Sequence, residues 1–504
     1  MAFHEAMFAR GRQRDGFRHK LPHVSRLTMS STLIPTRSQR DQALFLNEHL
    51  PAGLFGGVGA DVSRVAWRLS PQAFPLSPQT FSAIDRLGSD LLRFYQALNA
   101  LYTRSARGTA PGFIAEYLDR GKPEAIVKLA RQNRFRSDLP GVIRPDLILT
   151  ETGFIITELD NVPGGMGFTG AMAQAYAELG QQTIGDVDGI PDALSAMLVS
   201  VAGKEKPVTA IVVSEESKDY RSEMEWIAQA ITKRGHGTAY ACKPEDIMFT
   251  EDALFVRLSD DRVEKIDVLY RNFELFDFLN IAKQELMFYA ARHHRVKMTP
   301  PPKAQLEEKL AFALLHHPAL AKFWRAELGD VYERLRAIFP QTWVLDPRPL
   351  PPQGFIHGLH AAGEPVQNFL QLAVLGKSER DYVVKASGFS ESAWGSRSVK
   401  VANDLTKDAW ENALVKALGS FDTTPYVLQR FHKGKRVRIP YYDAKSDDIQ
   451  ILDGRVRLSP YYFVVDGGVR LGGILATVAG ADKKLIHGMT DAIMAPCVLD
   501  EAGY

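Results

Sequence analysis

The stretch FIITELDNVPGGMGFTG, residues 154–170, constrains the fold more than any other part of the chain. It joins an apolar run to a glycine-rich turn, and three side chains with oxygen atoms lie between them. These side chains are Glu158, Asp160 and Asn161. A second β-rich run precedes the turn Thr150–Gly153, which predicts a hairpin, and a helix is expected from about 170 to 179. The sequence therefore predicts oxygen ligands at the end of a strand, just before a turn and a helix.

The glycines of this stretch allow two readings. Gly165-x-Gly167-x-x-Gly170 has the spacing of a dinucleotide-binding turn, so an NAD(P)-dependent oxidoreductase is one interpretation. In such a unit the strand runs directly into the first glycine, and backbone N–H groups meet the pyrophosphate. Here Glu158 and Asp160 lie between the apolar strand and Gly165. Their carboxylates would repel a diphosphate unless a cation lay between the carboxylates and the phosphates. Both point to one face of a strand, where they could hold Mg²⁺ together with phosphate oxygens. A polar strand end without any ligand remains a third interpretation.

Composition bounds the class of protein. The chain has 504 residues, 45% apolar and 24% charged, and a formal net charge of +2. Nucleic acid is therefore not expected as a partner, and no apolar run is long enough for a membrane span. Two cysteines, Cys242 and Cys497, form no disulfide framework, so we expect a reducing, cytoplasmic location. The arginine-rich residues 1–40 are expected to form a disordered tail; a targeting segment and a start at Met29 are the alternatives.

The pattern of apolar residues changes along the chain. Helical spacing dominates from about 41 to 140, with the longest predicted helix at 81–104. Residues 207–272 alternate between strands and an amphipathic helix, which favours a small parallel sheet. After a proline stop near 298 a helix is expected, and the chain becomes α+β. It ends in successive antiparallel strands joined by Asp-Gly and Gly-Gly turns. The sequence therefore predicts α/β and α+β regions in one chain.

Two lysines indicate a phosphate site. Lys385 lies inside the apolar strand DYVVKASGF, where a charged group needs an anionic partner. The following loop, GFSESAWGS, has the small residues expected of a lid over a triphosphate, and Glu391 in it is a possible metal ligand. Lys303 precedes a predicted helix, where a lysine and a helix N-terminus could together face phosphate. The strand PYVLQRF, 425–431, could pair its backbone with an adenine edge.

These motifs together resemble a known family. Arg144-Pro145-Asp146, then Glu158-Leu159-Asp160-Asn161 with Gly164-Gly165, is similar to the strands of circularly permuted ATP-grasp enzymes. The nearest resemblance is to the glutathionylspermidine synthase-like group, and a more distant one is to eukaryotic glutathione synthetase. In ordinary ATP-grasp enzymes the Glu-x-Asn strand follows the two lysines, whereas here it precedes both. Asp160 stands at the usual Asn position, so the choice between Asp160 and Asn161 as metal ligand stays open.

The resemblance implies a fold and an activity. The implied fold is a circularly permuted ATP-grasp with a small inserted parallel-sheet substrate domain. Residues 41–200 would form a helical region with the metal-binding hairpin, 201–297 the α/β substrate domain, and 298–504 the ATP-grasp nucleotide-binding region. The implied activity joins a small-molecule acid and an amine into an amide through an acyl phosphate, with ATP and Mg²⁺ and release of ADP and phosphate. A catalytically silent ATP-binding scaffold is the alternative, and the substrates and oligomeric state are not predicted.

The resemblance also implies site residues. The metal ligands would be Glu158, Asp160, Asn161 and Glu391. The ATP contacts would be Lys303, Lys385, Gly388, Ser390, Ser392, Gln429 and Arg430. The substrate contacts would be Arg144, Pro163, Gly164, Gly165 and Arg271, with Arg144, Lys385 and Glu391 as the catalytic residues.

Overall fold

The computed structural model describes residues 37–51, 53–54, 68–393, 397–486 and 491–500. Ser38–Tyr504 forms one compact unit, and the description below concerns that unit. The predicted basic tail lies outside the described residues except at its end. There Arg40 belongs to helix α1 (Gln39–His49), and its guanidinium lies 2.7 Å from the Asp447 carboxylate. Within the described ranges, every helix is too short or too polar to span a bilayer.

The largest sheet has the strand order β1-β21-β20-β19-β3-β4, and β18 and β2 pair with β19 and β21. Its strands are β1 (Arg68–Leu69), β2 (Phe74–Leu76), β3 (Val142–Thr150), β4 (Gly153–Asp160), β18 (Arg436–Asp443), β19 (Asp448–Val465), β20 (Gly468–Gly480) and β21 (Ile493–Leu499). The predicted hairpin around Thr150–Gly153 is confirmed as β3–β4. The Asp466-Gly467 turn between β19 and β20 has positive φ at both residues, as Asp and Gly tolerate.

A second predicted turn, at Asp453-Gly454, is wrong. These residues lie inside the continuous strand β19, where Gly454 pairs with Val437 of β18 on one side and Gly480 of β20 on the other. Pairing on both edges holds the backbone extended, so tertiary context overrides the local turn preference.

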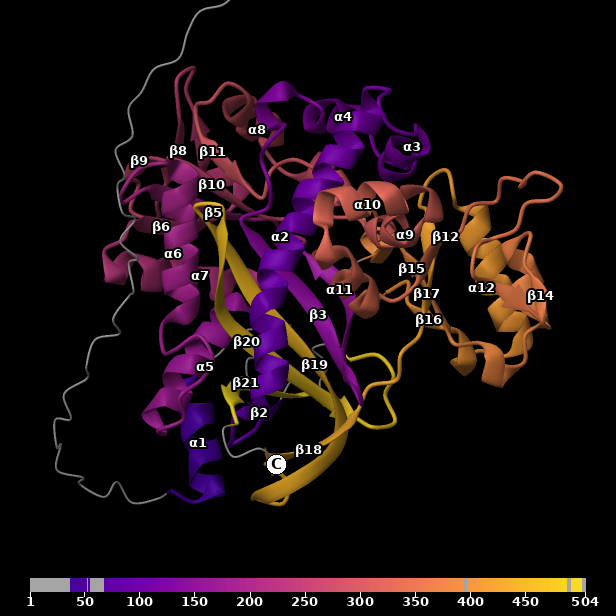
Figure 1. Cartoon of the computed structure of the whole chain (residues 1–504). Coiled ribbons are helices and arrows are strands. Elements are labelled where there is room, and N and C mark those ends of the chain that lie inside the picture. The colour runs from indigo at the N-terminus through magenta and orange to yellow at the C-terminus, as the bar shows by residue number, and fades with distance from the viewer. Residues whose placement is uncertain (1–36, 52, 55–67, 394–396, 487–490, 501–504) are drawn as a thin grey trace, which may run out of the picture. The chain divides into compact units, whose positions relative to one another are not determined.

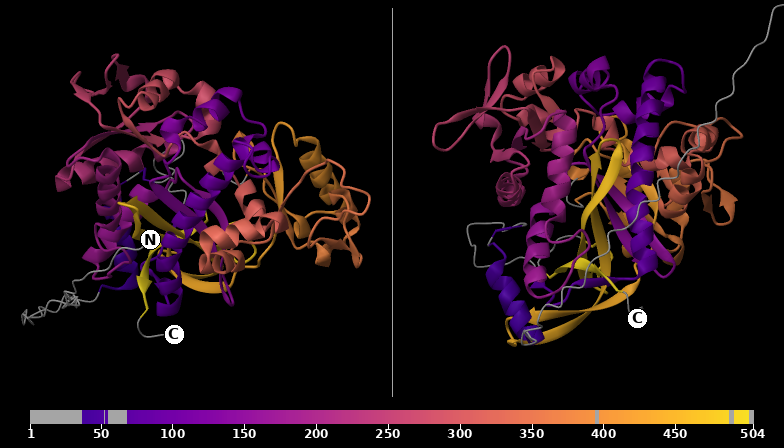
Figure 2. Two further views of the ribbon diagram at one scale, coloured as in Figure 1. Left: turned by 45° about the horizontal axis from the view of Figure 1, so that its top comes forward. Right: turned by 60° about the vertical axis from the view of Figure 1, so that its left-hand side comes forward.

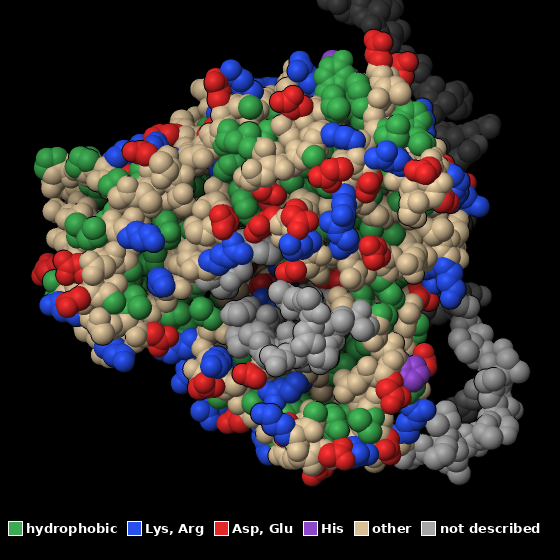
Figure 3. All heavy atoms as spheres, turned by 180° about the vertical axis from the view of Figure 1, so that it is seen from behind, with side chains coloured by type: hydrophobic (Ala, Val, Ile, Leu, Met, Phe, Trp, Pro, Cys, Tyr) green, Lys and Arg blue, Asp and Glu red, His purple; other side chains and the backbone are tan. Residues whose placement is uncertain are grey.

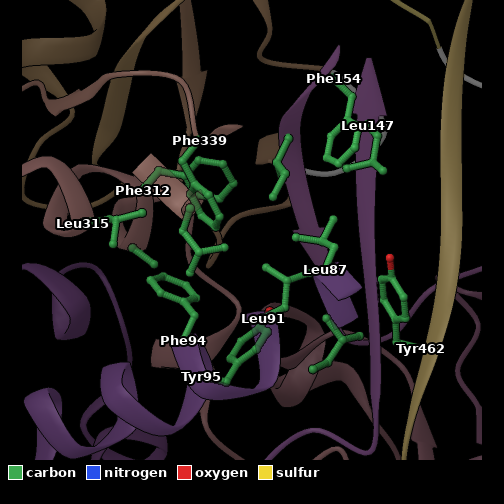
Figure 4. Packing of buried hydrophobic residues seen from close by; sticks show 14 of the residues in the cluster. Leu87, Leu91, Phe94, Tyr95, Leu147, Phe154, Phe312, Leu315, Phe339 and Tyr462 are labelled. Atoms are coloured by element: carbon green, nitrogen blue, oxygen red, sulfur yellow. The ribbon is translucent and has the colours of Figure 1, made fainter. Parts of the chain in front are cut away.

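Helix α2 (Pro78–Ala106) covers one face of the large sheet, as the helical spacing predicted. Figure 4 shows its Leu87 and Leu91 directed toward Leu147 and Tyr462 of the sheet. Gly88 permits this approach, since a Cβ there would lie 2.6 Å from the Tyr462 ring. Further helices complete this core: α9 (Leu310–His316), α10 (Ala321–Leu328) and α11 (Asp330–Ile338). The helix expected after residue 298 is thus α9, preceded by a single 3₁₀ turn.

The opposite face of the large sheet packs on helices α5 (Met166–Glu178) and α6 (Gly189–Ala202), and α7 (Arg221–Arg234) packs on these two helices. Along β19, Tyr461 and Phe463 belong to this core, whereas Tyr462 between them belongs to the core under α2. This alternation follows from the two-residue period of a strand. Figure 2 shows the helices on the two sides of the sheet.

The predicted parallel sheet is confirmed in the order β11-β10-β5-β6. Its strands are β5 (Val208–Val213), β6 (Thr238–Cys242), β10 (Val268–Asn272) and β11 (Lys297–Thr299). Beside it lie a small antiparallel sheet of β7 (Ile247–Phe249), β8 (Leu254–Arg257) and β9 (Val263–Lys265), and helix α8 (Gln284–Arg292).

A third sheet has the order β12-β17-β15-β16. Its strands are β12 (Thr342–Val344), β15 (Tyr382–Ala386), β16 (Lys400–Val401) and β17 (Tyr426–Arg430). One face packs on α12 (Lys407–Gly419) through Val384, Leu428 and Trp410. Because side chains alternate along a strand, Lys385 and Gln429 point to the other face. Figure 1 shows this sheet beside α12 and the short hairpin of β13 (His360–Ala361) and β14 (Glu364–Pro365).

The remaining helices are short. Two α-helices, α3 (Phe113–Asp119) and α4 (Glu124–Ala130), follow α2. The 3₁₀ turns are Asn133–Phe135, Lys218–Tyr220, Pro244–Asp246, Leu275–Asn280, Ala304–Leu306, Pro318–Leu320, Phe369–Val374, Lys377–Glu379, Glu391–Ala393 and Ala402–Asp404. On the face seen in Figure 3, acidic and basic side chains are interspersed with apolar ones.

Candidate functional site: a basic pocket between two sheets

A pocket of about 540 Å³ is lined by the β3–β4 hairpin, by β15 and β17, and by the segment that follows β17. Its basic residues are Lys309, Lys385, Arg430, Lys433, Arg455, Arg457 and Lys484, and its acidic residues are Asp146, Glu158 and Asp381. The pocket therefore has seven cationic and three anionic side chains in its walls. Such an excess of positive charge suits an anion with several negative charges, such as a polyphosphate.

The hairpin register gathers the charged residues of β3 and β4. Arg144 lies opposite Asp160, and Asp146 lies opposite Glu158. Directly opposite residues of an antiparallel pair project from the same face, so all four side chains share one side of the sheet. Arg144 pairs with Asp160 at 2.6 Å and with Asp146 at 3.3 Å. The predicted catalytic Arg144 is therefore already held by two carboxylates.

Asp146 is the centre of a buried network. It pairs with Arg144 and with Arg457 of β19, whose Nη1 lies 3.1 Å from Oδ2, and Ser459 donates a hydrogen bond to Oδ1 at 2.9 Å. Burial alone would raise the pKa of Asp146, but the two guanidinium groups more than offset it and hold the pKa below its ordinary value. The carboxylate thus stays ionised and fixes two arginines at the pocket wall.

Glu158 forms an ion pair with Lys309, with Nζ 2.7 Å from Oε1. Lys309 Nζ also donates to the Ala393 carbonyl at 3.2 Å, so it joins β4 to the loop after β15. Burial favours a higher pKa for Glu158, but the Lys309 charge outweighs it and lowers the pKa. The Glu158 side chain retains 39% exposure and faces the pocket. Sequence reasoning missed Lys309, although the charged run Glu307-Glu308-Lys309 before an apolar helix was a usable signal.

Lys385 bridges the two sheets. Its Nζ donates to Gln429 Oε1 at 2.8 Å on β17 and to the Thr157 carbonyl at 3.1 Å on β4. Burial lowers the pKa of Lys385 to about 8, although the nearby Glu158 charge acts in the opposite direction. The sequence predicts an anionic partner for Lys385. The two hydrogen-bond acceptors of its ammonium group are neutral: the Gln429 amide oxygen and the Thr157 carbonyl.

Gln429 and Arg430, which the sequence predicts as ATP contacts, both line the pocket. Gln429 uses its Nε2 to donate to Thr342 Oγ1 at 3.3 Å, which fixes the amide that holds Lys385. The Arg430 guanidinium lies 4.6 Å from the centre of the Tyr382 ring. Because β17 pairs with β12 and β15 on its two edges, its backbone is occupied up to Arg430. The segment Phe431–Gly434 that follows also lines the pocket.

The structure does not bring Lys303 to this pocket. Its ammonium is buried and donates to Asn99 Oδ1 at 2.9 Å and to the carbonyls of Arg136 and Asp138 at 3.1 and 2.7 Å. Burial lowers its pKa to about 8. Lys303 therefore joins the segment before α9 to α2 and to the carbonyls of Arg136 and Asp138. Lys309, not Lys303, lines the basic pocket.

The residues that line the basic pocket do not include Glu391, Gly388, Ser390 or Ser392. The Glu391 side chain is 76% exposed and pairs with Arg397 at 3.2 Å. With Ser390 it lines a separate cavity of about 340 Å³. Ser390 and Ser392 share a hydrogen bond of 2.8 Å, and a Cβ at Gly388 would lie 2.3 Å from the Glu307 carbonyl oxygen. The glycine is thus required by a close backbone approach.

The predicted metal ligands are not assembled as one cluster. Asp160 pairs with Arg144 and accepts the Val162 N–H at 2.8 Å, and the Asn161 amide donates to the Leu306 carbonyl at 3.0 Å. Nowhere in the described ranges do three His, Cys, Asp or Glu side chains come close enough to hold a metal ion. Glu158 alone of the predicted set lines the pocket. Since Mg²⁺ in nucleotide sites takes one or two carboxylates plus phosphate oxygens and water, these residues fit Mg²⁺ only together with a bound phosphate.

The glycine turn serves packing. Gly165 N–H and Phe168 N–H, at the N-terminus of α5, both donate to the buried Glu223 carboxyl at 3.1 Å. A Cβ at Gly167 would lie 2.5 Å from the Glu223 carbonyl oxygen, and one at Gly170 would lie 2.8 Å from the Trp226 ring. The carboxyl of α7 occupies the place that a pyrophosphate would need, so the structure does not support the dinucleotide reading. Burial raises the pKa of Glu223 to about 7.

The predicted substrate contacts have partners within the chain. Arg271 is fully buried, pairs with Glu307 and donates to the Phe273 carbonyl. Pro163 is buried and Gly164 is partly buried, and the Tyr461 hydroxyl donates to the Gly164 carbonyl at 2.9 Å. Arg271 therefore stands in a formed ion pair, outside the residues that line the basic pocket.

The sequence matches no family model and no curated protein. A structure of a glutathione synthetase-like effector from Globodera pallida in apo form is similar, with 14% identity and a TM-score of 0.55, covering 91% of this chain and 96% of that chain. A second solved structure, provisionally named a gamma-glutamylcysteine synthetase, from Methylobacillus flagellatus, has 11% identity and a TM-score of 0.40, covering 82% and 87%. The mixed α/β chain thus has the fold of a glutathione synthetase-like effector over nearly its whole length.

Proposed function

We propose that the chain is an ATP-dependent carboxylate–amine ligase. The observation that carries this proposal is the basic pocket in which Lys309, Lys385 and Glu158 meet between the β3–β4 hairpin and the β15–β17 strands. Ammonium groups from two segments and one carboxylate in a cleft between sheets are the elements needed to hold a magnesium-bound triphosphate. The likeness to a glutathione synthetase-like effector supports the same class of reaction.

Each part of the pocket has a role in this proposal. Lys309 and Lys385 neutralise phosphate oxygens, and the segment Phe431–Gly434 borders the adenine. Glu158 would hold Mg²⁺, which would supply charge neutralisation of phosphate oxygens. A substrate carboxylate oxygen attacks the γ-phosphorus and ADP leaves, which gives an acyl phosphate. The amine nitrogen then attacks the acyl carbon, phosphate leaves, and the amine proton passes to solvent or base, which gives an amide. Arg457, which lines the pocket, would stabilise the anionic transition state.

The finer classification also belongs to the proposal. The carboxylate strand β4 precedes Lys309 and Lys385 in the chain, which is the order of a circularly permuted ATP-grasp enzyme. The parallel sheet of β5, β6, β10 and β11 would then belong to the substrate-binding part.

The test is ADP release from ATP and Mg²⁺ with pools of small acids and amines. The proposal predicts ADP release that requires both an acid and an amine, and its loss in Glu158→Gln, which keeps the size of the side chain. ATP turnover that is the same with and without amine would reject the ligase. A silent scaffold is the second candidate, because Glu391 lies outside the pocket and no three-ligand cluster is found in the described ranges. It would bind ATP without ADP release under every substrate pair.

A further inference from the structure

Three consecutive residues before α9 each form an ion pair with a different segment of the chain. The pairs are Glu307 with Arg271 of β10, Glu308 with Lys122 between α3 and α4, and Lys309 with Glu158 of β4. In the middle pair both side chains are almost fully buried, with 2% of Lys122 and 1% of Glu308 exposed. A buried ion pair is often no more stabilising than apolar side chains of the same volume, so stability does not by itself explain this pair.

Both carboxylate oxygens of Glu308 have a partner. Oε1 accepts from Lys122 Nζ, and Oε2 accepts from the hydroxyl of Ser387, the residue that follows β15. The Ser387 hydroxyl in turn accepts from the N–H of Leu310, the first residue of α9, at 3.0 Å. Lys122 is also held by the Leu118 carbonyl of α3 at 2.6 Å. Glu308 therefore joins three segments: the end of α3, the start of α9 and the end of β15.

Two of the segments that Glu308 joins carry lysines of the basic pocket. Lys309 follows Glu308 directly, and Lys385 lies two residues before Ser387. Burial and the Lys309 charge both lower the pKa of Lys385, which indicates that the two ammonium groups lie near each other. Because like charges repel, the segments that carry them need an attachment that keeps both groups at one cavity.

We propose that Glu308 is a positioning residue for these two lysines. Its carboxylate holds the start of α9 against the end of β15, and so sets the spacing at which Lys309 and Lys385 bind one polyphosphate. Glu308 is not among the residues that line the pocket, so it acts through the lysines and does not touch the ligand. The inference rests on the proposed function, because it assigns both ammonium groups to phosphate oxygens.

The two attachments of Glu308 are removed in two variants. Ser387→Ala removes the hydroxyl that joins Glu308 to β15 and keeps the buried ion pair. The double variant Lys122→Met with Glu308→Leu replaces the ion pair by apolar side chains of similar size. No unpaired charge is then left buried, so this variant is expected to stay folded. Thermal unfolding of both variants checks this before binding is measured.

Binding of phosphate is measured separately from binding of the base. Calorimetry with the full chain uses three probes: Mg-ATP, inorganic triphosphate and adenosine. The double variant is expected to weaken Mg-ATP and triphosphate binding by about tenfold, and Ser387→Ala by about threefold, because displaced ammonium groups lose charge-assisted hydrogen bonds. The affinity for adenosine is expected to stay unchanged in both variants. Damage to the whole fold would instead weaken the binding of all three probes together.

A control variant removes an ion pair elsewhere in the chain, between α2 and α11. Asp90 pairs with Arg334 at 2.8 Å, its side chain is 9% exposed, and neither residue lines the basic pocket. Asp90→Asn is expected to lower the melting temperature and to leave the three affinities unchanged. A double-mutant cycle then isolates the positioning role. In the Lys309→Met background, loss of the Glu308 ion pair is expected to change the triphosphate affinity by less than about twofold, because one of the two lysines is already absent.

Unchanged triphosphate affinity in both variants would overturn the positioning role of Glu308. Equal weakening of adenosine and triphosphate binding, or an undiminished effect in the Lys309→Met background, would also overturn it. A wild type that binds triphosphate but not Mg-ATP would reject the proposed function, and the triphosphate titrations would still decide the role of Glu308. A wild type that binds neither Mg-ATP nor triphosphate would overturn both.

Discussion

Lys309 Nζ lies 2.7 Å from Glu158 Oε1, and this ion pair joins the residue before α9 to the end region of β4. Lys309 also contacts the loop after β15 through the Ala393 carbonyl. Three segments that are far apart in the sequence therefore meet at one ammonium group. In the proposed function, the Lys309 ammonium group contacts a phosphate oxygen, and its ion pair with Glu158 is weakened.

The two lysines before α9 should respond differently to substitution. Lys309→Met is expected to weaken Mg-ATP binding by about tenfold or more, because it removes a charge from the pocket. Lys303→Met is expected to lower the melting temperature, because it leaves three acceptors unpaired, with little change in the Kd of ATP. Calorimetry and thermal unfolding of both variants check this. The reverse order of the two ATP affinities would contradict the assignment.

Lys385 should make ATP binding depend on pH. Its pKa is lowered to about 8, so the ammonium that phosphate attracts is lost as the pH rises through 8. The affinity for Mg-ATP is expected to be constant below this value and to fall by up to about tenfold per pH unit above it. Lys385→Arg stays charged, so its affinity should be flat from pH 7 to 9. A flat wild-type profile would show that Lys385 does not contact the bound anion.

Glu223 should make folding stability depend on pH. Its folded pKa is raised from 4.5 to about 7, so its contribution to stability is complete below pH 4.5 and is lost as the pH rises through 7. Glu223→Gln cannot ionise. The unfolding free energy of the wild type relative to this variant is expected to fall by on the order of 3 kcal/mol between pH 4.5 and 8. Urea denaturation at several pH values measures this difference. A pH-independent difference would contradict the raised pKa.

Gly167 should be required for packing. An Ala Cβ there would meet the backbone of Glu223, so Gly167→Ala is expected to cost about 2 to 3 kcal/mol of unfolding free energy. Gly112→Ala is the matched control, because a Cβ at Gly112 meets nothing within 4 Å. NAD is expected to leave the melting temperature of the wild type unchanged. If Gly167→Ala leaves the unfolding free energy unchanged, or if NAD raises the melting temperature, a dinucleotide-binding turn would again be favoured.

Local patterns predicted the elements of the fold well. The helical spacing before residue 106 found α2, and the alternation around Thr150–Gly153 found β3 and β4. The prediction of a turn at Asp453-Gly454 is wrong because strands pair with β19 on both sides. A prediction from the local sequence does not include this pairing. The glycines at 165–170 were likewise not explained by local sequence. They are required because α7, more than fifty residues away in the chain, packs closely against them.

The candidate site was predicted only in part. Glu158, Lys385, Gln429 and Arg430 line one pocket. Strand periodicity accounts for Lys385 and Gln429, which point to the same face of their sheet. The sequence predicts Lys303 because it follows the prolines and precedes an expected helix, whereas the α-helix begins only after Lys309. Ion pairs such as Arg271 with Glu307 depend on the final packing, so the sequence could not show that this arginine is already paired.

The central claim is that the pocket between the β3–β4 hairpin and the β15–β17 strands binds the nucleotide. Photolabelling with 8-azido-ATP and Mg²⁺, followed by peptide mapping, tests it most directly. Labelling is expected within Tyr382–Ala386 or Arg430–Gly434; excess ATP should prevent it, and Lys309→Met should reduce it. Labelling of the segment 346–370, or labelling that ATP does not prevent, would contradict it.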